Sequence, residues 1–160
     1  MAGAEDRLRA LKRAHASVQT GPTPRVEDYV EVIYELILEK GYARIVDIGA
    51  HLHVSSPTAT KMIQKLGEEG LVVYERYRGI ALTEAGTELA KQVRHRHGIV
   101  MDFLKLLGLD DAAAHRATEG VEHHIEAATL DKLADLVSYA RAHPEWWSAH
   151  RSKSAPRTGK

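Results

Sequence analysis

The sequence contains no cysteine among its 160 residues, and this absence excludes several kinds of site. Without cysteine there is no disulfide framework, no thiolate metal site and no cysteine nucleophile. The apolar runs extend over only a few residues, whereas a membrane-spanning helix needs about 20. The first residues also lack the apolar stretch of a signal peptide. We therefore expect a cytoplasmic protein with no membrane partner.

The chain also lacks a net charge, because 22 basic side chains balance 22 acidic ones. This balance argues against a uniformly basic surface for nucleic acid, but it is compatible with a local basic patch. Histidine, by contrast, is abundant, with ten residues. Histidine is the commonest metal ligand in proteins, so the positions of the histidines decide whether they point to a metal site.

The first half of the chain predicts a winged helix-turn-helix. Residues 23–41 have a helix-starting Thr-Pro pair, apolar residues at helical spacing and a final glycine. A short helix over 46–52 and a third helix over 56–70, capped by Ser56, follow after tight turns. The apolar residues and basic turn of 71–82 predict a β-hairpin. We expect a mainly α protein with a two-stranded wing.

The second half predicts only helices. A helix capped by Thr83 is expected to reach position 107, and a further helical segment begins at Asp110 and passes through 119–126. The last expected helix carries apolar residues from position 130 onward, and His143-Pro144 closes it. The final ten residues contain four basic side chains and no acidic one, which indicates a disordered basic tail.

The third helix and the hairpin carry the candidate DNA contacts. A recognition helix enters the major groove with its N-terminal end, where small hydroxyl side chains and free backbone N–H groups approach phosphates and bases. The candidates are hydroxyl, amide and basic side chains of this helix and its cap, with two arginines at the tip of the hairpin: Ser55, Ser56, Pro57, Thr58, Thr60, Lys61, Gln64, Lys65, Arg76 and Arg78. Taken singly, these residues are more typical of an ordinary surface helix and a solvated turn; their order along the chain favours DNA binding.

Two clusters of acids and histidines, together with one isolated histidine, indicate a metal site. Asp28 and Glu31 lie three residues apart, so they share one face of the first helix. Glu119, Glu122 and His123 have the spacing i, i+3 and i+4, which would also place them on one helical face, and His97 is a further candidate in the long helix. Each cluster alone is also typical of a solvated helix face.

The chemistry of these candidates suits a hard or borderline divalent cation such as Mn²⁺, because oxygen ligands dominate and thiolate is absent. The four carboxylates carry four negative charges, which two divalent cations would balance. Without metal, four carboxylates held together would repel one another. We therefore expect a site with two Mn²⁺ ions per subunit; Fe²⁺ or Zn²⁺ remain open alternatives, since intrinsic affinity alone does not favour manganese over zinc.

Residues 23 to about 140 resemble the manganese-regulator branch of the diphtheria-toxin-repressor family. The matching motifs are EDYVE (27–31), KGYAR (40–44), TKMIQKL (60–66), YRG (77–79), RH (96–97) and EGVEHH (119–124). The resemblance implies a homodimer whose subunits have a winged-helix domain and a helical dimerisation domain. We therefore expect a DNA-binding domain (23–83) and a metal-binding and dimerisation domain (84–142). A basic arm (1–22) and a basic tail (143–160) fall outside the resemblance. The resemblance also implies six manganese ligands: Asp28, Glu31, His97, Glu119, Glu122 and His123.

The differences between branches of the family bear on the metal. The iron-responsive branch usually has methionine and cysteine where this chain has Asp28 and Glu119, which favours manganese. An acidic ligand of the iron branch's second site is replaced here by Met101, although His115 fits part of that site. Gly98 stands where relatives carry a larger residue, and a glycine inside a helix costs about 1 kcal/mol.

We therefore expect a manganese-activated, sequence-specific repressor that binds double-stranded operator DNA and controls metal homeostasis genes. An iron- or zinc-responsive regulator is the nearest alternative. A binuclear carboxylate enzyme is a different class, but di-iron bundles use Glu-x-x-His pairs, and the residue three positions after Glu119 is Glu122. A metal-independent winged-helix repressor is a third possibility. We expect neither catalysis nor a small-molecule substrate.

Overall fold

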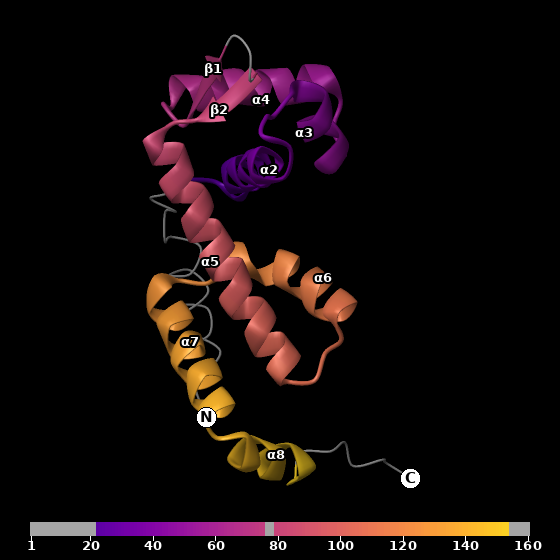
Figure 1. Ribbon diagram of the computed structural model, residues 1–160, viewed down its shortest axis with the longest axis vertical. Helices are drawn as coiled ribbons and strands as arrows, with labels where there is room; N and C mark the ends of the chain where they lie inside the picture. Colours follow the sequence, from indigo (N-terminus) through magenta and orange to yellow (C-terminus); the bar gives the residue numbers. More distant parts are fainter. Residues whose placement is uncertain (1–21, 76–78, 154–160) are drawn as a thin grey trace, which may run out of the picture. The chain divides into compact units, whose positions relative to one another are not determined.

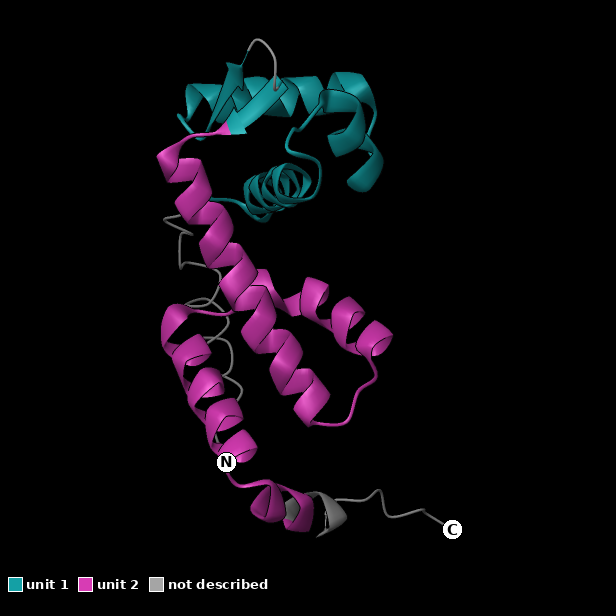
Figure 2. Cartoon of the chain, viewed as in Figure 1, with its two compact units in different colours: residues 1–81 teal, residues 82–160 magenta. Residues whose placement is uncertain are grey.

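The computed structural model describes residues 22–75 and 79–153, with side chains as far as Ala149. The chain divides into two compact units, Met1–Ala81 and Leu82–Lys160, which we call unit 1 and unit 2 (Figure 2). Each unit is described by itself below. None of the helices in the described ranges combines the length and the apolar composition needed to cross a lipid bilayer.

Unit 1 has the order expected for a winged helix-turn-helix (Figure 1). Its helices are α2 (Pro24–Lys40), α3 (Ile45–His51) and α4 (Ser56–Glu68), and they precede a hairpin of β1 (Val72–Glu75) and β2 (Gly79–Leu82). Helix α2 packs against α3, and α3 packs against α4. The apolar side chains that the sequence pattern placed inside are buried, including Val30, Ile33 and Leu66. The mainly helical fold with a two-stranded wing is confirmed.

Helix α2 begins and ends where its sequence predicts. The Thr23 hydroxyl accepts a hydrogen bond from the Val26 amide at 3.4 Å, Pro24 occupies the first turn, and Gly41 closes the helix with a left-handed φ of 77°. Glycine takes this conformation without steric cost.

The cap of α4 is one residue earlier than expected. Ser55, not Ser56, has the extended backbone of a cap, and its Oγ accepts from the Thr58 amide at 3.4 Å. Ser56 is instead the first helical residue. The prediction was wrong by one position because two adjacent serines precede the proline, and a cap oxygen must reach the amide three residues ahead.

The hairpin is joined to the loop after α2. The Ile80 amide donates to the Ala43 carbonyl at 3.0 Å. Gly79 has φ of 78°, and a Cβ atom at this position would lie 2.6 Å from the Ala43 oxygen. Only glycine fits here, which explains why the YRG motif ends in glycine. Arg76 and Arg78, the two arginines expected at the tip, lie outside the described residues.

Unit 2 is built on a long helix, α5 (Glu84–Leu106), against which α6 (Asp111–Val121) and α7 (Ala127–Ala142) pack (Figure 1). The caps are those expected: the Thr83 hydroxyl accepts from the Gly86 amide at 3.0 Å, and the Asp110 carboxylate accepts from the Ala113 amide at 2.8 Å. Small and branched side chains such as Ala90 and Val93 are fully buried on α5 and permit close helix packing.

Two expectations for unit 2 were wrong. The helix expected to pass through 119–126 ends at Val121, and Glu122–His124 forms a short 3₁₀ turn, η1. Gly120 precedes this break, and glycine is a weak helix former. In addition, the segment expected as a basic tail begins with a helix, α8 (Pro144–Lys153), because proline is compatible with the first turn of a new helix. The Trp147 indole donates to the Leu106 carbonyl at 3.0 Å and holds α8 against the end of α5.

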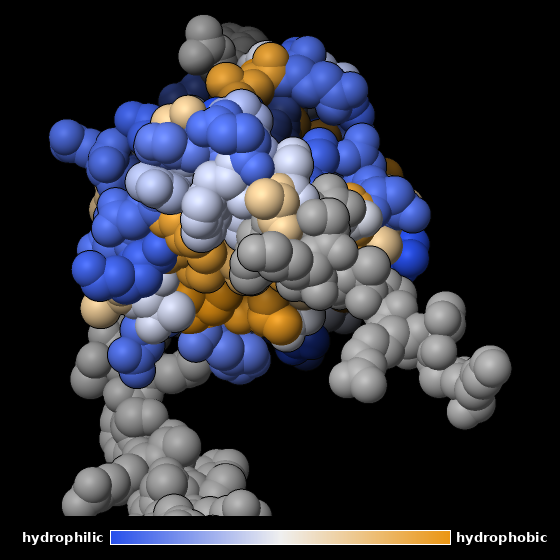
Figure 3. Space-filling model, turned by 90° about the horizontal axis from the view of Figure 1, so that it is seen from below, coloured by the Kyte–Doolittle hydropathy of each residue, from blue (hydrophilic) through white to orange (hydrophobic). Residues whose placement is uncertain are grey.

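Residues 1–21 of the arm and the last seven residues (154–160) lie outside the described part of the chain. Several large apolar side chains of unit 2 are exposed: Leu107, Val121, Tyr139 and Trp146. Figure 3 shows the molecule from below, with an apolar patch that is bordered on several sides by hydrophilic side chains.

Candidate metal centre

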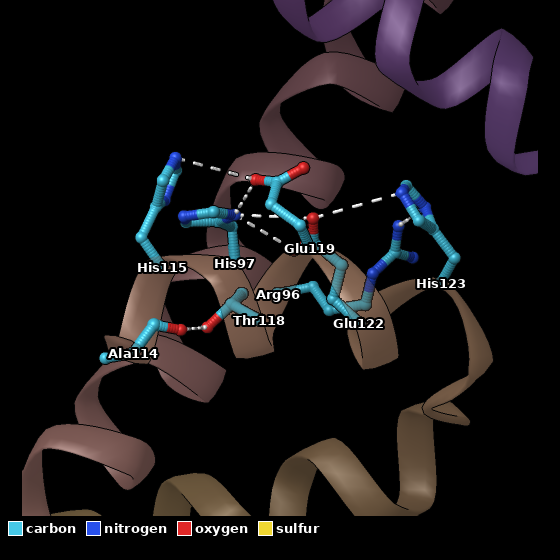
Figure 4. Close-up of polar contacts among 8 residues, drawn as sticks. All are labelled: Arg96, His97, Ala114, His115, Thr118, Glu119, Glu122 and His123. Carbon is cyan, nitrogen blue, oxygen red and sulfur yellow. Dashed lines mark hydrogen bonds and ion pairs between the residues drawn. The ribbon is translucent and has the colours of Figure 1, made fainter. Parts of the chain in front are cut away.

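His97 is the centre of a cluster of carboxylates in unit 2 (Figure 4). It projects from the middle of α5 toward Glu119, in the last turn of α6, and Glu122, in η1. Its Nδ1 atom lies 3.3 Å from Oε1 and 3.1 Å from Oε2 of Glu122, and 3.5 Å from Oε1 of Glu119. Three of the residues expected as metal ligands therefore meet, although they come from segments more than 20 residues apart.

Burial in η1 is the reverse of what hydrophobicity dictates. The Glu122 side chain is fully buried, whereas its neighbour Val121 is 44% exposed. Acidic side chains are almost never fully buried unless they are paired. The break between α6 and η1 thus places a carboxylate in the interior at the expense of an apolar side chain, which indicates a role for that carboxylate beyond packing.

One oxygen of Glu122 makes no hydrogen bond to any described residue. Oε2 is buried and lies 3.1 Å from Nδ1 of His97, but the pair does not have hydrogen-bond geometry. A buried polar atom in this state costs about 1–3 kcal/mol, and such exceptions call for an explanation such as a bound ion. A divalent cation that prefers carboxylate and imidazole ligands fits this atom and its neighbours.

His123 occupies the far side of Glu122. Its Nε2 is 3.9 Å from Oε1 of Glu122, and its Nδ1 is 3.4 Å from a terminal nitrogen of Arg96. Arginine can only donate hydrogen bonds, so Nδ1 accepts in this contact. The Arg96 guanidinium therefore helps to orient the His123 ring through Nδ1, while Nε2 is the ring nitrogen near Glu122.

Asp28 and Glu31 belong to unit 1. Both are partly buried and, three residues apart on α2, they share one face of that helix, as the sequence indicates. The structure brings together the four expected ligands of unit 2. The meeting of these four with Asp28 and Glu31 remains a prediction.

Sequence reasoning gave His115 only a minor part, as a fragment of an iron-type site. In the structure, one potential ligand atom each from His97, His115 and Glu119 lie within 4.8 Å of one another. The i, i+4 spacing of His115 and Glu119 on α6 was the available clue. The contact between Arg96 and His123 could not be inferred in this way, because no helical spacing relates the two residues.

The candidate DNA-contacting residues in the described part of the chain form one exposed surface. It comprises Ser55, Ser56, Pro57, Thr58, Thr60, Lys61, Gln64 and Lys65. The opposite side of α4 is buried at Ala59 and Leu66. Some hydroxyls already make local bonds, since Thr60 Oγ1 donates to the Ser56 carbonyl at 2.9 Å. Their contacts with DNA stay a prediction.

A winged helix followed by helices that carry a buried carboxylate–histidine cluster defines a metal-responsive DNA-binding regulator. Family models agree with both parts: "Iron dependent repressor, N-terminal DNA binding domain" matches residues 23–80, and "Iron dependent repressor, metal binding and dimerisation domain" matches residues 83–146. The chain belongs to the iron dependent repressor family.

Similar proteins include two regulators named HTH-type transcriptional regulator MntR. That of Shouchella clausii is 48% identical over 118 residues, which cover 74% of this chain and 82% of the relative. That of Listeria monocytogenes serotype 4a is 42% identical over 124 residues, which cover 78% of this chain and 87% of the relative.

Two solved structures are similar in fold and sequence. The manganese regulator SloR matches with a TM-score of 0.65 and 29% identity over 74% of this chain and 55% of that one. The apo form of the manganese-activated repressor ScaR matches with a TM-score of 0.63 and 29% identity over 71% of this chain and 54% of that one. The chain thus spans about half the length of these two proteins.

Proposed function

We propose that this protein is a manganese-activated transcriptional repressor that acts in the cytoplasm, binds operator DNA as a homodimer and controls genes of metal homeostasis. The observation that carries the proposal is the fully buried Glu122 carboxylate, which faces His97 and has an oxygen without a hydrogen bond. The proposal gives this cluster a regulatory role, with no substrate and no catalytic step.

The donor chemistry supports manganese. Carboxylates and imidazoles suit Mn²⁺, and a chain without cysteine offers no thiolate to favour softer ions. SloR and ScaR, two similar proteins, are a manganese regulator and a manganese-activated repressor. Iron or zinc would be the activating metal only if the same six ligands selected it over manganese. A titration of operator binding with each metal tests this.

The proposed site has six ligands and two ions. His97, Glu119, Glu122 and His123 come from unit 2, and Asp28 and Glu31 come from α2 of the DNA-binding unit. Bound cations would supply four positive charges, which balance the four carboxylates. Without them, bringing Asp28 and Glu31 to Glu119 and Glu122 would set like charges together, which is unfavourable. The two units therefore hold one defined orientation only in the metal-bound protein.

Orientation matters because a dimer must present two recognition helices at the spacing of the DNA. Half-sites lie about 34 Å apart, or a multiple of this distance. The exposed face of α4 would enter the major groove, and the exposed apolar side chains of unit 2 support association with a second copy. A coupling of 1–3 kcal/mol would change operator affinity roughly 5- to 150-fold.

The test is fluorescence anisotropy of a labelled operator, selected from a random DNA pool by the manganese-loaded protein. The wild-type protein should bind tightly with Mn²⁺ and weakly with a chelator. Glu31→Ala should retain only the weak, salt-sensitive binding that phosphate contacts provide. Glu35→Ala is the matched control, because it removes an exposed carboxylate one turn further along α2. Equal wild-type affinity with and without metal would refute the proposal.

A further inference from the structure

Two consecutive residues of α5 contact two consecutive residues of η1. His97 faces Glu122, and Arg96 reaches His123, the next residue along the turn (Figure 4). A terminal nitrogen of Arg96 lies 3.4 Å from Nδ1 of His123, and Nε2 of the same ring lies 3.9 Å from Oε1 of Glu122. The proposed metal site accounts for three of these four side chains. Arg96 is itself a cation beside a site for cations, which no ligand role explains.

The contact between Arg96 and His123 is largely shielded from water. Only 10% of the His123 side chain is exposed, and the Glu122 side chain is fully buried. The Nε atom of Arg96 is also buried. An arginine side chain does not lose its proton in a protein. In the metal-free protein, a permanent positive charge therefore lies one imidazole ring away from the buried carboxylate.

Arg96 determines which nitrogen of His123 carries the proton. Every N–H group of a guanidinium donates, so Nδ1 of His123 accepts in this contact. A neutral imidazole has one N–H group and one lone pair, which places the proton of His123 on Nε2. Nε2 is also the nitrogen near the Glu122 carboxylate, where an N–H group is electrostatically favourable. Both neighbours therefore stabilise the same tautomer.

This arrangement is incompatible with a metal ion on His123. An imidazole binds a metal ion through a nitrogen that carries no proton. A cation on Nε2 requires the proton to move to Nδ1, which then no longer accepts from the guanidinium. A cation on Nδ1 takes the place of the arginine N–H group. Either route breaks the contact between Arg96 and His123.

We propose that Arg96 is a positioning residue that opposes metal binding, because its guanidinium holds His123 in the tautomer of the metal-free state and is displaced when Mn²⁺ binds. The contact then helps to set the manganese concentration at which the protein is activated. This inference rests on the proposed function, since it takes His123 as a manganese ligand. The alternative is that Arg96 only fastens η1 to α5. Loss of an antagonist tightens manganese binding, whereas loss of a fastening weakens it.

Electron paramagnetic resonance of free Mn²⁺ in equilibrium with the full-length protein measures the affinity. Arg96→Met keeps an apolar stem and removes the charge and the donors. A net hydrogen bond changes an equilibrium constant roughly 2- to 13-fold, and we expect Arg96→Met to bind Mn²⁺ more tightly by a factor in this range. Arg94→Met is the matched control, because it removes an exposed arginine of the same helix; screening by salt should leave its affinity unchanged. Unchanged or weaker binding by Arg96→Met would overturn the inference, as would equal tightening in the control.

A double-mutant cycle links the effect to the imidazole. His123→Gln should weaken manganese binding, and Arg96→Met should lose most of its effect in that background. Tightening of the same size in both backgrounds would show that Arg96 acts on another group, and the inference would fall. If His123→Gln bound Mn²⁺ as the wild type does, the proposed ligand set would lose His123 and the inference would fall with it. If His123→Gln weakened binding and only Arg96→Met failed, the ligand set would stand without the inference.

The tautomer of His123 provides a measurement that needs no change at Arg96. Nitrogen-15 NMR of the metal-free wild-type protein distinguishes a ring protonated on Nδ1 from one protonated on Nε2, and the signal absent from His123→Gln belongs to His123. We expect the proton of neutral His123 on Nε2. A proton on Nδ1 would contradict the inference, because that nitrogen could not then accept from the guanidinium.

Discussion

Glu122→Gln is the most direct test of the buried carboxylate. The substitution keeps the volume of a side chain that is fully buried and changes its charge beside His97. In the metal-free protein, Glu122 already has a buried oxygen without a hydrogen bond, a state that costs about 1–3 kcal/mol. Replacing the charge by an amide removes none of the packing. We therefore expect the metal-free variant to differ from wild type by less than about 1 kcal/mol in the free energy of unfolding.

The effect should appear on addition of manganese. A ligand at one thousand times its dissociation constant stabilises the folded state by about 4 kcal/mol. For a chain of this size, each kcal/mol raises the melting temperature by roughly 2–4 °C, so wild type should gain about 8–16 °C. Glutamine is a neutral and weaker ligand, and we expect the variant to retain less than half of this gain.

Thermal melting followed by circular dichroism, with and without Mn²⁺, provides the measurement. Glu88→Gln is the control, because it removes an exposed carboxylate of α5 whose ion pair with Lys91 at 3.0 Å is a surface contact of small energetic value. The control should keep the full manganese-dependent gain. If Glu122→Gln kept it as well, Glu122 would not be a ligand and the proposed centre would be wrong.

Three further predictions concern stability and charge. Gly79→Ala should destabilise unit 1 by about 1–3 kcal/mol, because φ is 78° and the new Cβ would lie 2.6 Å from the Ala43 oxygen; an unchanged melting temperature would contradict this. Gly98→Ala should stabilise α5 by about 0.5–1 kcal/mol, since, apart from its chain neighbours and the backbone of its own helix, no atom of the described residues lies within 4 Å of the added Cβ; chemical denaturation would reveal the opposite sign if the site were crowded. The Lys105 ammonium, hydrogen-bonded to the Asp111 carboxylate at 2.7 Å, lowers the pKa of Asp111; the small stabilisation from this depressed pKa is present above the ordinary aspartate pKa and is lost as the pH falls through the folded value. Lys105→Met should return the pKa of Asp111 toward its usual range in an NMR titration, and an unchanged pKa would refute the assignment.

The helix ends of this protein were predictable where a single residue controls them. Thr23, Gly41 and Thr83 each act within one turn of the backbone, so their identity alone specifies the geometry. The error at Ser55 arose where two equivalent hydroxyls compete for one cap. The residues at this helix start therefore predicted the presence of α4 but not the position of its first residue.

The metal cluster was predictable in composition but not in geometry. The i, i+3, i+4 argument put Glu119, Glu122 and His123 on one helix, whereas the chain leaves the α-helix at Val121. Glu122 reaches His97 because of that break, which depends on tertiary packing against α5. Helix periodicity carries no information about such packing. The contact between His115 and His97 could not be predicted for the same reason, because the two rings belong to different helices.

The contact between Trp147 and the Leu106 carbonyl has a practical consequence. Both tryptophans of the sequence, at positions 146 and 147, lie on α8. Emission excited selectively from tryptophan therefore reports the docking and melting of the C-terminal unit, because the DNA-binding unit contains no tryptophan. Comparing this emission with the helical signal of the whole chain would show whether the two units unfold together or in sequence.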